Sequence, residues 1–370
     1  MAVPRVVVVG AGVVGAAVAM RLAERGAVVT VVEASRPGAG TSGGSFGWLN
    51  ANEKLPRHYF ELNLRGMREH RVLASRSAHW YHPVGNLEFA DAHGAGELVE
   101  RAERLRDWGY PVRAPDPEQA ARLEPAVRTE PGAVAYFPDE GYVDGQLLVD
   151  TLLAHARAAG AQVLVGEPVT DLVVGGTRVR GVRLRKGRID ADLVVLCAGW
   201  QTTELAERAG VRVPLVSPHQ AGSRAVCLLA EVEPPAGVRL RRVVHAPGIV
   251  ARPTQHGRLL IEPDHIPAGL VFGAPPPPEP GEALLAIARR LLPGLAGRGL
   301  AARLCVRPMP EDRYPVVGWC PGLPGCYVAA THSGITLAPY LSILAAAELL
   351  DAQPAEELAP YRPDRFVEVA

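Results

Sequence analysis

The stretch Val6-Val-Val-Val-Gly-Ala-Gly-Val-Val-Gly15 opens with a run of β-branched residues and closes with three regularly spaced glycines. Such a run is typical of a strand buried on both faces of a parallel sheet. Residues 16–25 carry an apolar stripe at helical spacing, and Val28-Val-Thr-Val-Val-Glu33 is a second buried strand. Strand, helix and strand together predict a βαβ unit.

Each residue of the glycine-rich turn has a physical role in binding a dinucleotide. Gly10 permits the tight turn, Gly12 lets the backbone approach a pyrophosphate, and Gly15 lets the helix pack closely on the strand. The helix N-terminus, at Val13–Val14, offers free amides and a positive dipole end to phosphate. Glu33 stands 18 residues after Gly15, where it can accept hydrogen bonds from a ribose diol. The motif predicts a dinucleotide cofactor but does not separate FAD from NAD.

The loop that follows, residues 36–48, is rich in glycine and hydroxyl side chains and includes Thr41-Ser42-Gly43-Gly44. This composition suits a loop that wraps a second part of a long cofactor. A surface linker has the same composition, so the residues alone leave both interpretations open.

The composition narrows the class of protein. The chain has 370 residues with 39 basic and 39 acidic side chains, and a net charge of zero disfavours a nucleic-acid partner. Five cysteines contain no CxxC pair and no apolar run of membrane-spanning length is apparent. We expect a cytoplasmic protein without a transmembrane segment. Neither HExxH nor a GxSxG elbow is present, so we expect no metal and no hydrolase chemistry.

Motifs along the whole chain resemble those of the family of FAD-dependent amine and D-amino-acid oxidases. This family includes glycine oxidase, sarcosine oxidase and D-amino-acid dehydrogenases. The motifs are the opening fingerprint with the Thr41–Gly44 loop, Asp139-Glu-Gly-Tyr-Val-Asp-Gly145, Asp192-Leu-Val-Val-Leu-Cys-Ala-Gly-Trp200, Arg307-Pro-Met-Pro-Glu-Asp-Arg-Tyr-Pro315, and Thr331-His-Ser-Gly334. The resemblance covers nearly the whole chain.

The resemblance implies FAD as the cofactor and extends the set of residues that hold it. Val169 would lie near the adenine, and Ala198, Gly199 and Trp200 would approach the cofactor from a later strand. The flavin ring would lie near Gly43–Gly44 and the turn around His332. Residues 334–350 read as a helix, and its first amides, at Gly334, Ile335 and Thr336, could stabilise negative charge on the reduced flavin.

The family pattern also implies two interleaved domains. An FAD-binding Rossmann-like βαβ domain would comprise residues 1–50, 140–215 and 300–370. An α+β substrate domain built on an antiparallel sheet would comprise residues 51–139 and 216–299. From the sequence we expect helices at 58–75, 94–108 and 144–160, a strand at 193–196, and a meander of strands over 162–190.

Two residues are candidates for the chemistry. An amino-acid substrate needs a cation for its carboxylate, and Arg307 matches the arginine with this role in glycine-oxidase-like members. A solvated surface arginine is the alternative. His332 matches the histidine of a glycine–histidine pair near flavin, but Thr331 replaces the glycine, so a structural histidine is an equal alternative. His219, Tyr59, Trp48 and Tyr314 are further pocket candidates.

Cys305 raises the question of covalent attachment. It lies two residues before Arg307, where sarcosine-oxidase-like members carry a cysteine bonded to FAD. Glycine-oxidase-like members lack this bond, and a buried cysteine is commonly a small hydrophobe. In sarcosine-oxidase-like members a lysine near the flavin assists the reaction with oxygen. The corresponding residues here, 256–265, contain no lysine. We therefore expect slow reaction with O2 and better turnover with another electron acceptor.

Taken together, the sequence predicts an FAD-dependent enzyme that oxidises the C–N bond of a small amine or amino acid to an imine. The substrate would be a D-amino acid, glycine or an N-methyl amino acid. An NAD-dependent dehydrogenase and a non-catalytic FAD-binding redox sensor are the alternatives.

Overall fold

The computed structural model describes residues 3–367 except 235, 266, 268, 277 and 296–300. The helices are α1 (Val13–Glu24), α2 (Thr41–Gly44), α3 (Arg57–Ala74), α4 (Ala95–Asp107), α5 (Pro117–Leu123), α6 (Gly145–Ala158), α7 (Thr202–Glu207), α8 (Pro278–Leu291) and α9 (Gly334–Asp351). Short 3₁₀ turns lie at Gly199–Gln201, Glu356–Tyr361 and Pro363–Phe366.

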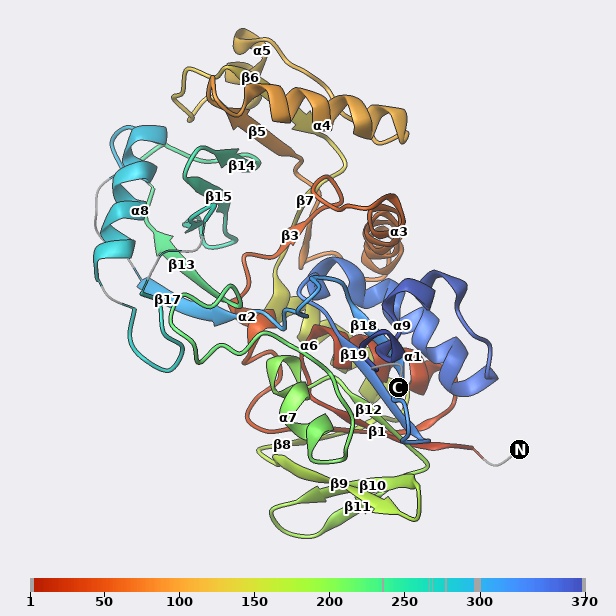
Figure 1. Ribbon diagram of the computed structural model, residues 1–370. Helices are drawn as coiled ribbons and strands as arrows, with labels where there is room; N and C mark the ends of the chain where they lie inside the picture. The colour runs from red at the N-terminus through yellow and green to blue at the C-terminus, as the bar shows by residue number, and fades with distance from the viewer. Residues whose placement is uncertain are drawn as a thin grey trace.

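A six-stranded sheet forms the centre of the lower lobe in Figure 1, in the order β18-β19-β12-β1-β2-β8. Its strands are β1 (Arg5–Val9), β2 (Val28–Glu33), β8 (Gln162–Val165), β12 (Leu193–Leu196), β18 (Val316–Trp319) and β19 (Cys326–Ala330). All neighbours are parallel except β18 and β19. The β-branched run at the start of the chain therefore occupies the middle of the sheet, as the sequence predicts.

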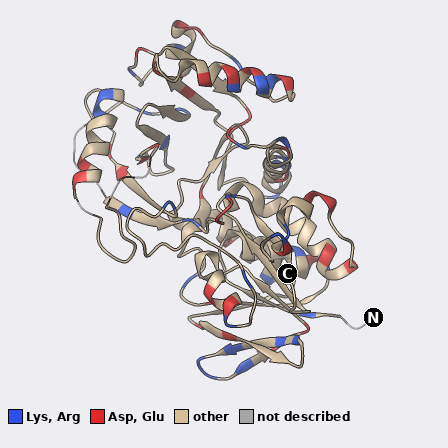
Figure 2. Ribbon diagram, viewed as in Figure 1, with Lys and Arg blue, Asp and Glu red and all other residues tan. Residues whose placement is uncertain are grey.

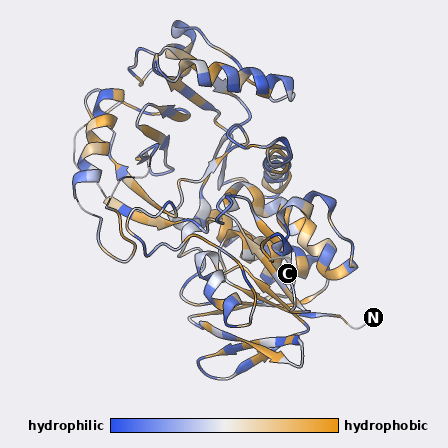
Figure 3. Cartoon of the chain, viewed as in Figure 1, coloured by the Kyte–Doolittle hydropathy of each residue, from blue (hydrophilic) through white to orange (hydrophobic). Residues whose placement is uncertain are grey.

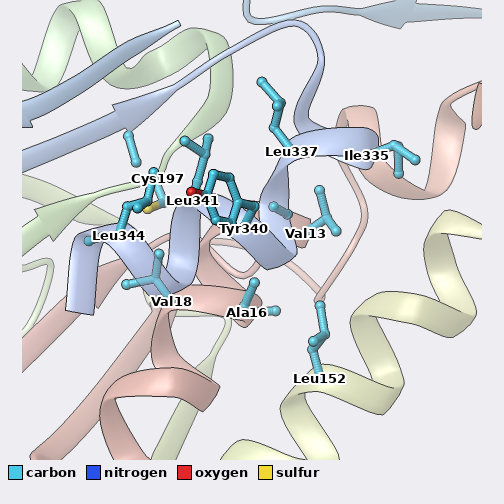
Figure 4. Packing of buried hydrophobic residues seen from close by; sticks show 14 of the residues in the cluster. Val13, Ala16, Val18, Leu152, Cys197, Ile335, Leu337, Tyr340, Leu341 and Leu344 are labelled. Carbon is cyan, nitrogen blue, oxygen red and sulfur yellow. The ribbon is translucent and has the colours of Figure 1, made fainter. Parts of the chain in front are cut away.

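Helix α9 packs against α1 and α3, and α1 packs in turn against α6. Figure 4 shows buried residues of α1, α6 and α9 in this cluster. Leu337 and Leu341 on α9 are fully buried, as are Ala16 on α1 and Leu152 on α6. Small residues along α1 permit the close approach, because alanine and glycine add little bulk between helix axes. Figure 3 shows the hydrophobic residues concentrated along the strands and helices of this lobe.

The upper lobe is built on a mixed seven-stranded sheet in the order β17-β13-β16-β15-β14-β5-β6. Its strands are β5 (Asn86–Ala90), β6 (Ala133–Phe137), β13 (Val226–Val232), β14 (Val243–Ala246), β15 (Ile249–Pro253), β16 (Leu259–Glu262) and β17 (Ala301–Val306). Only β14 and β5 pair in parallel; the other pairs are antiparallel. Helix α4 carries charges of both signs on its outer side in Figure 2 and buries Leu98, Ala102 and Leu105.

Two small sheets complete the fold. One is the meander β11-β10-β9, with β9 (Val169–Gly175), β10 (Arg178–Leu184) and β11 (Arg188–Asp190). The other, β3-β7-β4, joins the lobes through β3 (Trp48–Leu49), β4 (Tyr81–His82) and β7 (Gly141–Val143). The predicted meander is thus present, except that its first strand, β8, joins the central sheet beside β2.

The division into two domains remains a prediction, and the structure places one segment differently from it. Residues 301–306, which the sequence assigns to the FAD-binding domain, form β17 and pair with β13 in the upper sheet. The predicted boundary at 299–300 lies outside the described residues. The sequence pattern alone does not assign such an edge strand to one of the two sheets, because its pairing partner is distant in the sequence.

Helix α9 is also the one helix, within the described part of the chain, with the length and composition to cross a membrane. However, 78% of the apolar window is buried inside the protein. The apolar character of α9 is explained by its position between the sheet and the neighbouring helices.

We predict that Leu341→Ala lowers the free energy of unfolding by about 2–5 kcal/mol, because it opens a cavity where α9 meets α1. Val99→Ala is the control, since Val99 is 47% exposed on α4 and its truncation leaves no cavity. Denaturant unfolding of both variants measures the difference. Equal destabilisation would contradict the central role of α9.

Candidate functional site

A cavity of about 490 Å³ lies at the carboxyl ends of β1, β2 and β12, within the size range of cofactor sites. The residues proposed from the sequence that line it are Gly10, Gly12, Val13, Val14, Glu33, Thr41, Ser42, Val169, Ala198, Gly199, Trp200, His332, Gly334 and Ile335. Segments from the start, middle and end of the chain therefore meet in one site.

The glycines of the first turn are required by close packing. Gly10 has a φ of 101°, and a Cβ on it would lie 2.5 Å from the carbonyl oxygen of Cys197. A Cβ on Gly15 would lie 2.1 Å from the carbonyl oxygen of Gly10. By contrast, a Cβ on Gly12 would meet only the Ser42 hydroxyl, at 3.2 Å, because Gly12 borders the cavity. This geometry leaves room for a phosphate group against the backbone at Gly12.

Polar side chains fix the turn around the cavity. The Glu33 carboxylate accepts hydrogen bonds from the backbone amides of Ala11, at 2.8 Å, and Ser35, at 2.9 Å. The Val13 amide donates to the Ser42 hydroxyl at 2.9 Å, so the loop that contains α2 is held against the start of α1. The acid at the end of β2 consequently orders the loop as well as bordering the place where a ribose would bind.

Helix α9 also begins at the cavity, next to Val13 and Val14 of α1. Gly334 and Ile335 border the cavity, and the Ser333 hydroxyl bonds the Tyr59 hydroxyl at 2.8 Å. Because a helix N-terminus carries partial positive charge, its amides suit an anionic edge of a cofactor. Thr336 points elsewhere: its hydroxyl donates to the Trp48 carbonyl at 3.5 Å.

Several residues proposed from the sequence lie near the cavity without bordering it; they are Gly15, Gly43, Gly44, Cys305, Arg307 and Thr336. Gly43 and Gly44 allow close packing, since added Cβ atoms would lie 2.7 Å from the Gly38 carbonyl oxygen and 3.5 Å from the Cys305 sulfur.

The Cys305 thiol is buried beside Gly44. It faces the Thr41 carbonyl at 3.8 Å. Cys305 is also directly opposite Cys227 in the pairing of β17 with β13. A hydrogen bond from the Cys227 thiol lowers the pKa of Cys305, against the effect of burial.

The sequence analysis did not identify some of the residues that line the cavity. The missed residues are Val9, Val32, Ala34, Ser35, Gly38, Ala39, Gly40, Ser45, Pro168, Cys197, Gln201, Glu204, Leu205, Arg208, Pro308, Ala329, Ala330 and Thr331. Most are direct neighbours of residues that were identified, so a rule that includes adjoining positions would have found them. Glu204, Leu205 and Arg208 are different: they lie on or just after α7, which carries no cofactor motif.

His332 borders the cavity as a neutral ring. Burial, together with the positive charges of Lys54, Arg307 and Arg313, lowers its pKa to about 3. Its Nδ1 atom is buried and has no hydrogen-bond partner among the described residues. The Thr331 hydroxyl, which replaces the family's glycine, accepts from the Ser333 amide at 3.1 Å and so stabilises the turn. A neutral His332 can accept a hydrogen bond but supplies no positive charge.

Arg307 lies at the end of β17, next to Pro308, which borders the cavity. One Nη atom donates to the Arg224 carbonyl at 3.0 Å, while the Nε atom is buried without a partner. Its charge acts on both His332 and Glu262. Burial raises the pKa of Glu262 to about 7, so this carboxyl offsets the charge of Arg307 only in part at neutral pH.

The aromatic pocket candidates lie around the cavity and do not border it. Tyr59 and Tyr314 pack edge to face with their ring centres 5.4 Å apart. The rings of Trp48 and His245 are tilted by 45° with their centres 4.2 Å apart, and His219 packs edge to face on Trp200 at 5.5 Å. We assign them packing roles.

Comparison with known proteins identifies the class. A family model described as FAD dependent oxidoreductase (DAO) matches residues 5–348. The chain belongs to this family. It is 29% identical to the glycine oxidase of Pseudomonas aeruginosa over 97% of this chain and 98% of the relative.

Solved structures agree with this assignment. The crystal structure of glycine oxidase from Geobacillus kaustophilus has a TM-score of 0.87 at 25% identity, covering 99% of this chain and 100% of the other. L-proline dehydrogenase from P. horikoshii shares the fold, with a TM-score of 0.87 at 20% identity and 98% coverage of both chains.

This DAO-family chain is therefore an FAD-dependent oxidoreductase, and its resemblance to the amine and D-amino-acid oxidases is confirmed. The cavity fits FAD in three respects: an open backbone at Gly12, a carboxylate at Glu33, and a helix N-terminus at Gly334. The family assignment removes the two alternatives of an NAD-dependent dehydrogenase and a non-catalytic sensor. Within the described residues, no group of three or more His, Cys, Asp or Glu could hold a metal ion.

We predict that Gly12→Val purifies without flavin, because the side chain would fill the space between the backbone and the pyrophosphate. The control is Gly96→Val, on the exposed side of α4, where an added Cβ meets no atom within 4 Å. The absorbance ratio of flavin to protein measures the result. Full flavin content in Gly12→Val would disprove the assignment of this turn.

Proposed function

We propose that this enzyme oxidises the C–N bond of a small amino acid or amine to an imine, and that Arg307 binds the substrate carboxylate. One observation carries the proposal: Arg307 has a buried Nε without a partner, and its charge reaches His332 at the edge of the cavity. A planar guanidinium with free N–H groups is the side chain best suited to a carboxylate.

The protein needs few other groups for this reaction. FAD, when bound, supplies the acceptor for hydride. The substrate nitrogen must lose its proton before the reaction, and its α-carbon must be held in a fixed orientation. A neutral His332 avoids adding repulsion against an ammonium group, while the buried Tyr59–Ser333 pair shields this side of the site from water.

The relatives support the substrate class. The Pseudomonas aeruginosa and Geobacillus kaustophilus relatives are named glycine oxidase. Glycine, N-methyl amino acids and D-amino acids each carry an amine nitrogen and a carboxylate on the same α-carbon, and we propose that the substrate belongs to this group.

The test is anaerobic mixing of the purified flavoenzyme with a panel of amines and amino acids. Bleaching of the flavin absorbance identifies a substrate, because hydride transfer removes the oxidised-flavin bands. Loss of bleaching when the carboxylate is replaced by an amide supports the role of Arg307. A panel in which only amines without a carboxylate react would disprove that role.

We predict that Arg307→Leu weakens binding of carboxylate substrates by about 1.5–3 kcal/mol, roughly 10- to 150-fold in the dissociation constant, because a charge-assisted contact is lost. Arg303→Leu is the matched control four residues earlier, on β17, since Arg303 pairs with Glu231 at 3.3 Å, outside the cavity lining. Dissociation constants come from the concentration dependence of flavin bleaching. Unchanged binding in Arg307→Leu would remove this residue from the site.

We propose that FAD is held without a covalent bond. In support, Cys305 lies outside the cavity lining and is hydrogen-bonded to Cys227. Acid precipitation followed by mass measurement decides between the two forms. A protein mass that includes FAD would establish covalent attachment and overturn the proposal.

The reduced flavin must pass its electrons to an acceptor, and we propose that this acceptor is not O2. Reduction of oxygen creates an anion that a fixed cation near the flavin would stabilise. The two candidate cations of residues 256–265, Arg258 and His265, are engaged elsewhere: Arg258 pairs with Glu231 and Glu233, and His265 with Asp264. His332, with a pKa of about 3, supplies no charge at neutral pH.

We predict slow reoxidation of the dithionite-reduced enzyme in air-saturated buffer and faster reoxidation by a quinone or dye. Stopped-flow absorbance of the flavin measures both rates. Reoxidation by air as fast as by the quinone would disprove the proposal and indicate that Lys54 or Arg307 serves oxygen.

We propose a cytoplasmic location. All five cysteines are free thiols in the structure, which suits a reducing compartment.

A further inference from the structure

Helix α7 and the residues that flank it present one face to the cofactor cavity. Gln201, Glu204, Leu205 and Arg208 border the cavity, whereas Glu207 of the same helix does not. The flanking residues Gln201 and Arg208 both have helical backbone conformations. The four positions are therefore spaced i, i+3, i+4 and i+7 along one helical segment, which places them on one side of it. The side of α7 that they form is the side turned toward the cavity.

This face of α7 lies beside the end of β2, where Glu33 marks the position of a ribose. The Glu167 amide donates to the Glu33 carbonyl at 3.0 Å, so the segment that leads into β9 lies against the end of β2. One Nη atom of Arg208 donates to the Thr170 carbonyl in that segment at 2.7 Å. Val169, between these two contacts, also borders the cavity. Because the adenine of FAD is attached to the ribose, α7 stands on the adenine side of the cavity.

Glu204 provides a hydrogen-bond acceptor on this side. Both oxygens of Glu33 already accept backbone amides, from Ala11 and Ser35. In Glu204, by contrast, Oε1 accepts from the Arg208 guanidinium at 2.5 Å, and no donor among the described residues contacts Oε2. A carboxylate accepts through both of its oxygens. Glu204 can therefore accept a further hydrogen bond without giving up its contact with Arg208.

The charges around Arg208 suit a base better than a phosphate. Its guanidinium lies 2.5 Å from Glu204 and 3.8 Å from Asp171, so two carboxylates face one cation. A phosphate would meet a net negative charge here, whereas an amino group would meet an acceptor. A planar guanidinium that is held by its N–H groups can also cover an aromatic ring. The side chains of Glu204 and Arg208 are 65% and 47% exposed, so their ion pair contributes little to the stability of the fold.

We propose that α7 recognises the adenine of FAD. The Glu204 carboxylate accepts a hydrogen bond from the 6-amino group of the adenine, and the Arg208 guanidinium covers the ring. Leu205, which is buried between them in the sequence, supplies an apolar contact. These residues select the cofactor whichever amine or amino acid the enzyme oxidises.

Flavin hypoxanthine dinucleotide is the matched probe, because it carries a carbonyl oxygen in place of the 6-amino group of FAD. An oxygen at this position cannot donate to Glu204 and is repelled by its charge. The holoenzyme is equilibrated with mixtures of FAD, this analogue and FMN, in potassium bromide at a concentration that permits exchange of the flavin. Chromatography of the flavins extracted from the protein gives the ratio in which they bind.

The chain offers a matched control for each substitution. Glu204→Gln is compared with Glu207→Gln, since Glu207 is exposed on the same helix and does not border the cavity. Arg208→Leu is compared with Arg185→Leu, since Arg185 is exposed in the turn between β10 and β11. Circular dichroism establishes that each variant is folded.

We expect the wild-type enzyme and both controls to prefer FAD over the hypoxanthine analogue by about 10-fold or more. Glu204→Gln should reduce this preference to about 2-fold or less, because the amide can turn to donate to the carbonyl oxygen of the analogue. Arg208→Leu should weaken FAD and the analogue alike, and so shift binding toward FMN by about 3- to 30-fold.

Equal binding of FAD and the hypoxanthine analogue by the wild-type enzyme would overturn the proposal. An equal change in Glu204→Gln and Glu207→Gln would also overturn it, because the effect would then belong to the helix as a whole. If Arg208→Leu left the ratio of FAD to FMN unchanged, Arg208 would have no contact with the adenine, and the proposed role of this residue would be wrong.

Discussion

The buried carboxylate of Glu140 is the interaction on which the relative position of the two sheets depends. It accepts hydrogen bonds from the Trp48 indole and Asn52 side chain, both at 3.2 Å, from Asn86 on β5 at 3.2 Å, and from the Tyr110 hydroxyl at 2.9 Å. These donors come from three separate segments of the chain, around residues 48–52, 86 and 110. Because an unpaired buried carboxylate is very unfavourable, the segments must assemble together for Glu140 to be satisfied.

The same residue links the fold to the site. Glu140 precedes β7, which continues to α6 on the cofactor side, and its amide donors precede Lys54 on the substrate side. Desolvation raises the pKa of Glu140 to about 8 in spite of its many donors. The Glu140 carboxyl is therefore a polar group in an apolar environment, and its bonds to the Ala51 and Asn52 amides hold the loop that carries Lys54.

The parts of the fold that could be predicted from the sequence have local signals. The strand at 6–9, the glycine turn and the helix at 334–350 each follow from periodicity and glycine spacing within a short window. The seven-stranded sheet could not be predicted in the same way, because β5 pairs with β14, more than 150 residues later. Helix α8, which begins within a proline-rich stretch at Pro278, was also missed. Similarly, the sequence identified Arg307 and His332 but not their electrostatic coupling to Lys54, because that coupling depends on side chains from three distant segments.

The arrangement of the cavity lining has a consequence for how the enzyme is made. Residues 9–45, 168–208 and 308–335 all contribute to the cavity, so the opening βαβ unit alone has only part of the binding surface. A ribosome releases the N-terminal strand and its glycine turn long before α9. During that interval the nascent chain lacks the stabilisation that a bound ligand gives to a folded state. Cofactor capture is consequently a late event in biosynthesis, and it distinguishes chains that have reached α9 from those that have not.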